Sequence, residues 1–238
     1  MDINIKKILS KARKCVEDYN MIQDGDKIAV GVSGGKDSLT LLCALSELKK
    51  FFPNKFELCA ITLDMGFDNV DYSNVQRLCD KIGVEYILEK TDIAQVLFDI
   101  RKESNPCSLC AKMRRGGVNA RARAAGCNKV ALGHHNEDAI ETFFLSLFYE
   151  GRINCFKTVT YLSKVDLTVI RPLLYVSERD IKGYAKTAQL PIVHNPCPAD
   201  GYTKRQEMKE YIEMKSKEDR YFKKRITNAI QTGIWKEK

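Results

Sequence analysis

The sequence has no apolar stretch long enough to span a bilayer, no internal repeat and no low-complexity tract. Its first seven residues, MDINIKK, contain no apolar segment of the kind that signal peptides carry. We therefore expect no membrane segment and a cytoplasmic location. A chain of 238 residues with 44% hydrophobic content is long enough for one large domain, or for one domain with an extension.

Histidine is scarce, with three residues, and the chain has a single C-x-x-C motif, at Cys107 and Cys110. A Cys₄ zinc ribbon needs two such motifs, so that class of zinc site is disfavoured. The nine cysteines are an odd number, and without a secretion signal they fit a disulfide framework poorly. Five of them stand in or near apolar patterns and are expected to be buried as small hydrophobic residues: Cys15, Cys43, Cys59, Cys79 and Cys127.

Acidic residues are outnumbered by basic ones, 31 to 39, which gives a formal net charge of +8. The excess is concentrated in two regions. Residues 101–129 contain eight basic residues and one acidic residue, and residues 201–238 contain eleven basic and six acidic residues. The rest of the chain is slightly acidic. Two basic regions on such a body suit an anionic polymer better than a small anion alone, so we expect a nucleic-acid partner.

Residues 33–38, with the sequence SGGKDS, join an apolar run to a segment with helical spacing of apolar residues. Gly34 and Gly35 allow a sharp turn and leave no Cβ between the main chain and a ligand. The first N–H groups of the following helix favour an anion. Lys36 can neutralise phosphate charge and Asp37 can meet a magnesium ion. The alternative is an ordinary Gly-Gly turn with helix capping.

The loop differs from the Walker motif, which places four residues between its first glycine and Gly-Lys-Ser/Thr. It resembles the SGGxDS loop of the PP-loop ATP pyrophosphatase superfamily. That resemblance implies that the loop holds the pyrophosphate of ATP while AMP is transferred to a substrate oxygen. The residues to which it assigns ATP binding here are Ser33, Gly34, Gly35, Lys36, Asp37 and Ser38.

Strand and helix patterns alternate along the chain, with strands expected at residues 27–32, 56–64, 84–88, 129–133 and 167–170. The alternation predicts an α/β fold with a mainly parallel twisted sheet of about five strands and helices on both faces. The resemblance implies the adenine nucleotide alpha hydrolase-like (HUP) fold. We expect an N-terminal helix in residues 1–26, an ATP-binding and cluster domain in residues 27–200, and a basic helical tail in residues 201–238.

Two further strand ends carry polar groups, and ligands of such sheets bind at the carboxyl ends of the strands. By the resemblance, Thr62, Leu63 and Asp64 line the adenine pocket, largely through backbone groups. The alternative for Asp64 is a cap on the turn before Gly66. The motif at residues 133–138 resembles the family motif beside the α-phosphate. It assigns Gly133, His134 and His135 to ATP, and Asp138, with Asp37, to magnesium. A zinc site and a purely structural histidine remain alternatives.

Three cysteines fit no core pattern. Cys107 and Cys110 stand just before a basic helix expected at residues 111–125, where the helix N-terminus and nearby arginines favour thiolates. Cys197 lies between two prolines, in a segment that suits a ligand presented from a loop. The C-x-x-C motif alone also fits a redox pair or half of a zinc site. Three cysteines suit a cluster of four irons with one iron open to a non-protein ligand.

Together, the SGGKDS loop, the PCSLC motif before a basic helix, the ALGHHNEDAIET run, the IRPL strand and a later lone cysteine resemble the tRNA 2-thiocytidine synthetase family. The resemblance covers nearly the whole chain and implies a [4Fe-4S] cluster on Cys107, Cys110 and Cys197. With Lys36 and Asp37, these cysteines form the expected catalytic set. The short chain and the segment after Cys197 depart from the family pattern. The arginines expected to contact RNA are Arg114, Arg115, Arg121 and Arg123.

The activity implied is ATP-dependent thiolation of tRNA. AMP is placed on a pyrimidine carbonyl oxygen, expected at C2 of cytidine, and sulfur then displaces it. The expected partners are tRNA and a sulfur donor such as a cysteine desulfurase, with a homodimer as one option for assembly. The alternatives are a tRNA lysidine synthetase-like ligase, a PP-loop sulfurtransferase on a non-tRNA substrate, and a non-enzymatic RNA-binding regulator.

Overall fold

The structure is a computed structural model that describes residues 3–101, 106–194, 196–198 and 204–236. Six strands form one sheet in the order β3-β2-β1-β4-β6-β5. Their bounds are β1 Asp26–Gly31, β2 Phe56–Asp64, β3 Glu85–Lys90, β4 Lys129–Ala131, β5 Val159–Leu162 and β6 Leu167–Ile170. All neighbouring strands run parallel except β5 and β6, which pair antiparallel.

The predicted α/β class and mainly parallel sheet are therefore confirmed, with one strand more than the five expected. The additional strand is β5, a four-residue edge strand on which Tyr161 is exposed and which pairs only with β6. β6 is equally short, but three of its four residues are buried, whereas none of the residues of β5 is buried, so β5 gives the weaker apolar signal. A turn before β6, with Asp166 at φ 49°, completes the hairpin.

The helices are α1 Ile3–Asp18, α2 Lys36–Lys49, α3 Ser73–Ile82, α4 Ile93–Gln95, α5 Pro106–Ala124, α6 Asn136–Tyr149, α7 Glu178–Thr187, α8 Lys204–Glu218 and α9 Phe222–Ile230. Within the described residues, none of these helices combines the length and the apolar character needed to cross a membrane. Short π-helical turns extend α4 over Val96–Ile100 and α9 over Gln231–Trp235.

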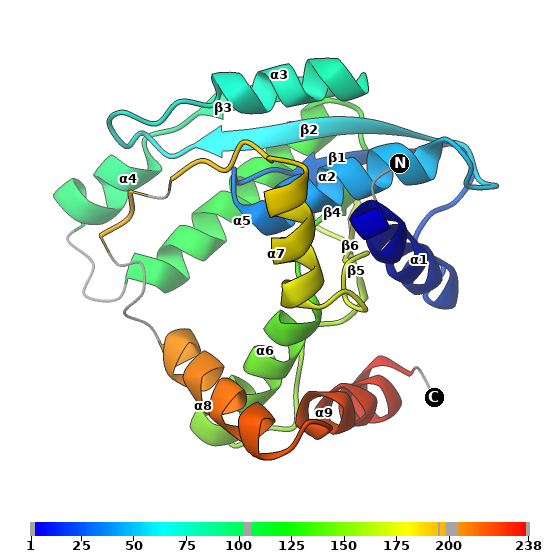
Figure 1. Cartoon of the computed structure of the whole chain (residues 1–238). Coiled ribbons are helices and arrows are strands. Elements are labelled where there is room, and N and C mark those ends of the chain that lie inside the picture. The colour runs from blue at the N-terminus through cyan, green and yellow to red at the C-terminus, as the bar shows by residue number, and fades with distance from the viewer. Residues whose placement is uncertain (1–2, 102–105, 195, 199–203, 237–238) are drawn as a thin grey trace.

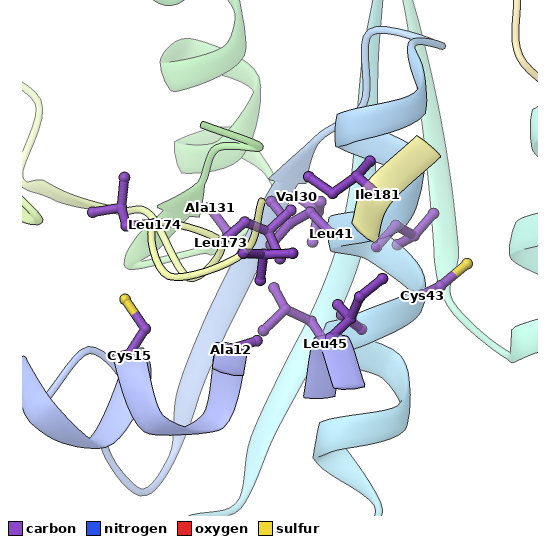
Figure 2. Close-up of a cluster of buried hydrophobic side chains, with 14 of the residues drawn as sticks. Ala12, Cys15, Val30, Leu41, Cys43, Leu45, Ala131, Leu173, Leu174 and Ile181 are labelled. Carbon is purple, nitrogen blue, oxygen red and sulfur yellow. The ribbon is translucent and has the colours of Figure 1, made fainter. Parts of the chain in front are cut away.

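Helices cover both faces of the sheet (Figure 1), and each face has its own apolar cluster beneath the helices. The larger cluster lies between the sheet and helices α1, α2 and α7. Figure 2 shows side chains of this cluster, among them Ala12, Val30, Leu45 and Ile181, which meet from four different elements. On the opposite face, α5 packs Ala122 against Val130 and Ile61. Each fully buried leucine or isoleucine contributes about 1.5–3 kcal/mol relative to exposure.

Helix α5 begins at Pro106, five residues before the predicted start of the basic helix. Proline suits the first helical position because its missing N–H would have no partner there. Cys107 and Cys110 consequently lie in the first turns of α5. The Gly116-Gly117 pair does not interrupt the helix. A Cβ on Gly117 would lie 2.7 Å from Leu63 Cδ1, so this glycine allows α5 to approach β2 closely.

The C-terminal helices α8 and α9 pack against α6, at the end of the molecule away from α3 (Figure 1). The rings of Phe144 and Phe222 stack with centroids 5.9 Å apart, and Tyr211 meets Phe144 edge-on. Met208 and Trp235 are buried in the same cluster as residues of α1 and α2. The expected division into residues 1–26, 27–200 and 201–238 stays a prediction.

Candidate active site

The loop between β1 and α2 is held by its own serines. The Ser38 hydroxyl accepts a hydrogen bond from the Ser33 backbone N–H at 3.1 Å and donates to the Gly35 carbonyl at 2.9 Å. Gly34 has φ +82°, and a Cβ there would lie 2.8 Å from the Val193 Cβ. Its carbonyl accepts the Val193 N–H at 3.0 Å. The loop therefore leaves the N-terminus of α2 facing outward, a position that favours an anion.

The end of β4 closes against the same loop. A Cβ on Gly133 would lie 3.0 Å from both the Asp37 carbonyl carbon and the Ser38 nitrogen, so only glycine fits this approach without displacement. His135 caps α6, and the Asp138 carboxylate accepts its N–H at 2.9 Å. The order of strands reverses between β1 and β4, where ligands bind in doubly wound sheets.

His135 lies among three carboxylates. Its Nε2 is 3.7 Å from Asp37 Oδ1 and 3.5 Å from Asp138 Oδ2, and its Nδ1 is 3.5 Å from Glu137 Oε2. Burial alone would lower the pKa of His135, but the bond to Glu137 and the charges of Asp138 and Asp37 raise it above its ordinary value. The buried Asp37 Oδ1 accepts no hydrogen bond from the described residues. An unpartnered carboxylate oxygen near Asp138 is a chemically suitable ligand for magnesium.

Lysine and arginine side chains from the C-terminal helices balance these acids. Arg205 Nη1 lies 3.0 Å from Glu141 Oε2, and Lys223 Nζ lies 3.3 Å from Glu137 Oε1. Burial would raise the pKa of Glu137, but its bonds to His135 and to the Glu178 N–H, with the charge of Lys223, hold that pKa at about 2. Helices α8 and α9 are thus joined by ion pairs to α6, which begins beside the SGGKDS loop, in addition to their apolar contacts.

Lys36 is held in the same network. Its Nζ lies 3.0 Å from Asp37 Oδ2 and 3.2 Å from Glu178 Oε1, and Glu178 also pairs with Lys209 and Lys182, each at 3.2 Å. Burial opposes ionisation of Glu178, but the three lysines outweigh it and bring the pKa of this carboxyl to about 2. The loop lysine therefore forms ion pairs with two carboxylates.

A cavity of about 500 Å³ opens beside the loop on the face covered by α5. Its walls include Val32, Leu63, Val118, His134 and Arg171. Burial, and then the charge of Arg171, lowers the pKa of His134, which is therefore neutral at pH 7. Its buried Nδ1 has no hydrogen-bond partner in the described chain. The cavity is large and apolar enough for a nucleoside, with a few polar groups that a ligand can engage.

The three residues predicted at the end of β2 occupy different positions. Thr62 is buried and donates its hydroxyl to the Val32 carbonyl at 2.7 Å, which ties β2 to the loop. Leu63 lines the large cavity. Asp64 Oδ1 accepts the Gly66 N–H at 3.0 Å. One of its two carboxylate oxygens therefore caps the turn before Gly66, as the alternative interpretation predicted. Thr62 therefore has a structural contact, whereas Leu63 and Asp64 remain beside space that a ligand can fill.

The five cysteines expected to be buried are buried, and so is Cys155, whose sequence pattern is ambiguous. Cys107 is exposed, and Cys110 and Cys197 are half-buried. Burial raises the pKa of Cys110, the charge of Arg114 lowers it, and Cys197 and Cys107 raise it further, which places the three thiols within electrostatic reach. Over the described ranges, no three His, Cys, Asp or Glu side chains are arranged as a metal-ion site. The donor set fits an iron–sulfur cluster chemically: three accessible thiols beside a cation.

The four arginines expected to contact RNA do not share one environment. Arg114 and Arg115 line the large cavity. Arg121 Nε lies 3.5 Å from Glu89 Oε2, and Arg123 Nη1 lies 3.5 Å from Asp166 Oδ2. The first two therefore face the candidate active site, and the other two are paired on the surface. Contact of these arginines with RNA stays a prediction.

Two residues of the site have no counterpart in the sequence predictions. Glu178 reaches Lys36 from α7, and its only sequence signal is its place in the first turn after Ser177, the N-cap residue. Arg171 carries its guanidinium 4.9 Å from the Phe156 ring centroid and donates to the Lys157 carbonyl at 2.6 Å. Burial lowers the pKa of Arg171 to about 10, so it stays charged at neutral pH beside His134.

Comparisons with known proteins agree with this geometry. A family model described as a PP-loop domain matches residues 4–215. The tRNA-cytidine(32) 2-sulfurtransferase of Geobacter sulfurreducens is 37% identical over 96% of this chain and 90% of its own length. The protein of the same name from Geotalea daltonii is 38% identical over 96% of this chain and 92% of its own length.

Among solved structures, the U34-tRNA thiolase NcsA from Methanococcus maripaludis, solved with its [4Fe-4S] cluster, superposes with a TM-score of 0.80. It is 24% identical, and the match covers 96% of this chain and 78% of that one. The likeness confirms the fold. With the family model over most of the chain and the relatives over nearly all of it, this chain belongs to the PP-loop family, in the branch of the tRNA-cytidine 2-sulfurtransferases.

Proposed function

We propose that this protein uses ATP to activate a cytidine of tRNA and replaces its C2 oxygen with sulfur. The names of the curated relatives support cytidine as the target and position 32 as its place in tRNA. The observation that carries the proposal is the position of Arg114. This side chain lines the cavity beside the SGGKDS loop and lies next to Cys110. Cys110 belongs to the cysteine set, by which we mean Cys107, Cys110 and Cys197. One residue thus adjoins both parts of a site for activation and sulfur transfer.

In the first half-reaction, the C2 oxygen of the base attacks the α-phosphorus of ATP and the bond to pyrophosphate breaks. The Ser33 and Ser38 hydroxyls, the Lys36 ammonium and the N–H groups at the start of α2 surround the position of the departing pyrophosphate. Asp37 and Asp138, which both lie near His135, would hold magnesium. His135, between them, fixes both carboxylates before ATP arrives.

In the second half-reaction, a sulfur nucleophile at the oxidation level of sulfide attacks C2, and AMP leaves with the former base oxygen. Cys107, Cys110 and Cys197 would hold a [4Fe-4S] cluster, which supplies one coordination position that no cysteine occupies. Arg114 favours the thiolate of Cys110. The sulfur comes from an external donor such as a cysteine desulfurase, whose persulfide sulfur is first reduced to sulfide by two electrons from a thiol reductant that becomes a disulfide. The reaction takes place in the cytoplasm. A homodimer is part of the proposal for assembly.

The test is an anaerobic reaction of the purified holoprotein with ATP, magnesium, a sulfide source and tRNA that carries cytidine at position 32. We expect one pyrophosphate and one AMP for each 2-thiocytidine found by nucleoside mass spectrometry. The matched control tRNA carries uridine at that position. Lysidine in a parallel reaction that contains lysine in place of the sulfide source would indicate a ligase. An absence of pyrophosphate release with every tRNA would overturn the proposal.

A further inference from the structure

A second, smaller cavity lies on the other side of the ATP loop, with a volume of about 220 Å³. This is roughly seven times the share of liquid volume that one water takes, about 30 Å³, and leaves room for one pyrimidine ring with its substituents. Its walls include Ser33 and Gly35 of the loop, Asp64, Tyr72 and Arg114. The cavity is thus open to the place where the phosphates of ATP would lie.

The opposite wall adjoins the cysteine set. Arg114 lines this cavity as well as the large one, and it lies one helical turn after Cys110 on α5. Pro196, which also lines the small cavity, directly precedes Cys197. A group bound here would therefore have the ATP loop on one side and two of the three accessible thiols near the other. The large cavity is lined near the cysteines by Ala111, Arg114 and Arg115 of α5.

The chemistry of the walls is that of a base-binding site. The half-buried ring of Tyr72 forms one wall, and Phe67, supported by Phe98 with ring centroids 6.0 Å apart, forms another. Aromatic faces bind unstacked bases. Asp64 accepts the Gly66 N–H with Oδ1, and no hydrogen bond within the described chain reaches its Oδ2. Tyr72, Asp64 and Arg114 all line this cavity. Burial, and then the charge of Asp64, raises the pKa of Tyr72, and the charge of Arg114 lowers it.

We propose that this cavity receives the target cytosine of the RNA, with Tyr72 stacking on the ring and Asp64 accepting a hydrogen bond from its exocyclic amine. The proposal rests on the tRNA-thiolation function given above and names the residues that select its base. A carboxylate suits cytosine because N4 is a donor, whereas uracil presents the O4 acceptor at the same place. Asp64 is thus the residue that distinguishes cytidine from uridine.

Leu63 and Asp64 are neighbours at the end of β2, so their side chains leave opposite faces of the strand. Leu63 lies against Gly117 of α5 and lines both cavities, whereas Asp64 lines only the small one. That cavity has more than twice the volume of the small one and accommodates adenosine. One strand end therefore serves both bases, with the nucleotide on one side and the RNA base on the other.

The test measures base binding directly. Anticodon stem-loop RNA with pyrrolocytosine, a fluorescent cytosine analogue, at the target position is titrated with holoprotein and a non-hydrolysable ATP analogue. We expect quenching with the wild type and with Tyr72→Phe, and loss of quenching with Tyr72→Ala. In competition, RNA with cytidine should bind at least about tenfold more tightly than RNA with uridine. Asp64→Asn should reduce this ratio to about threefold or less, because an amide can also donate to uracil O4.

The matched control is Asp68→Asn, which removes the same charge from an exposed position four residues away that lines neither cavity. It should keep the cytidine preference. If Asp64→Asn and Tyr72→Ala keep both quenching and preference and instead raise the KM for ATP, the cavity holds adenine and the proposal is wrong. RNA binding by the wild type that ignores the target base would overturn the cavity assignment alone. No binding of any tRNA would overturn the proposed function with it.

Discussion

At the ATP loop, the polar groups of Ser33, Ser38 and Lys36 already have partners within the chain, whereas the thiols of Cys107, Cys110 and Cys197 are not arranged as a metal-ion site within the described residues. The loop is six consecutive residues between a strand and a helix. The cysteine set joins positions 107 and 197, which are ninety residues apart. Local hydrogen bonds can build the first site, whereas the second needs two distant segments to meet.

This difference indicates that the two parts of the site depend on different stabilising forces. The loop geometry comes with the folding of β1, α2 and β4. Thiolate ligands gain their geometry when metal binds, because metal binding and local folding are coupled. The ATP part should therefore work without the cysteines, and the cysteine part should bind iron without ATP. Substitutions in each part therefore test whether ATP-dependent activation and iron binding are separable.

The largest effect is expected from Cys197→Ser. Removal of one of three thiolates should abolish stable iron binding and 2-thiocytidine formation, while pyrophosphate release with ATP and tRNA stays within about threefold of the wild type. The measurements are iron and sulfide content after anaerobic purification, nucleoside mass spectrometry and a pyrophosphate assay. Cys43→Ser makes the same chemical change in the core of α2 and should keep the iron. Full iron and full thiolation in Cys197→Ser would refute the ligand assignment.

Lys36→Met is the converse change. It removes the cation nearest the expected pyrophosphate, and loss of one group that stabilises a transition state lowers kcat by about 100-fold or more. Pyrophosphate release should fall by that factor, and iron content should stay at the wild-type level. Lys49→Met, at the exposed end of the same helix, is the control and should retain activity. Iron loss in Lys36→Met would show that the two parts are not separable.

The contrast between local and distant contacts also explains which features were predictable from the sequence. The SGGKDS loop, the parallel sheet and the polar strand ends follow from local patterns that dictate backbone geometry, and these expectations match the structure. The division of cysteines into buried and accessible ones was also largely predictable, because apolar patterns surround five of the six buried cysteines and prolines surround Cys197. The exception is Cys155, whose sequence pattern is ambiguous. Each of these inferences depends on residues close together in the chain.

Contacts between distant segments were not predictable. The pairing of Glu178 with Lys36 depends on how α7 packs beside α2, which no spacing in the sequence encodes. The separate environments of Arg114 and Arg121 depend on which side of α5 faces the sheet. The strand β5 was not predictable because none of its residues is buried, in contrast to the equally short β6. The function was nevertheless predictable, because the motifs that indicate it consist of residues close together in the sequence.

Gly34→Ala tests the physical link between the two parts. Gly34 has φ +82°, a Cβ there would lie 2.8 Å from the Val193 Cβ, and Val193 belongs to the segment that leads to Cys197. The left-handed conformation alone costs alanine about 1–2 kcal/mol. With the added clash, we expect a decrease of about 2 kcal/mol or more in the free energy of unfolding, a fall in Tm of about 4–8 °C.

The control for this change is Gly126→Ala, at φ +74° with nothing within 4 Å of the added Cβ, which isolates the backbone strain. Thermal unfolding measures both variants. Gly34→Ala should also lower iron content, since the Val193 N–H bond to the Gly34 carbonyl positions the segment before Cys197. Equal Tm values for the two variants would show that the contact between loop and segment contributes nothing to stability.

The smallest effect concerns Glu178→Gln. Lys36 binds Glu178 Oε1 at 3.2 Å in the structure, so the phosphates of ATP must compete with this carboxylate for the lysine. Removal of the negative charge removes the competitor, and we expect the KM for ATP to fall about threefold, a change of roughly 0.65 kcal/mol. Because pyrophosphate is then held more tightly as well, kcat should fall by a similar factor.

Steady-state kinetics separates the two constants, and Glu210→Gln, which changes an exposed acid on α8, is the control. An increased KM would mean instead that Glu178 builds the loop, and that Lys36 needs this carboxylate in order to point toward ATP.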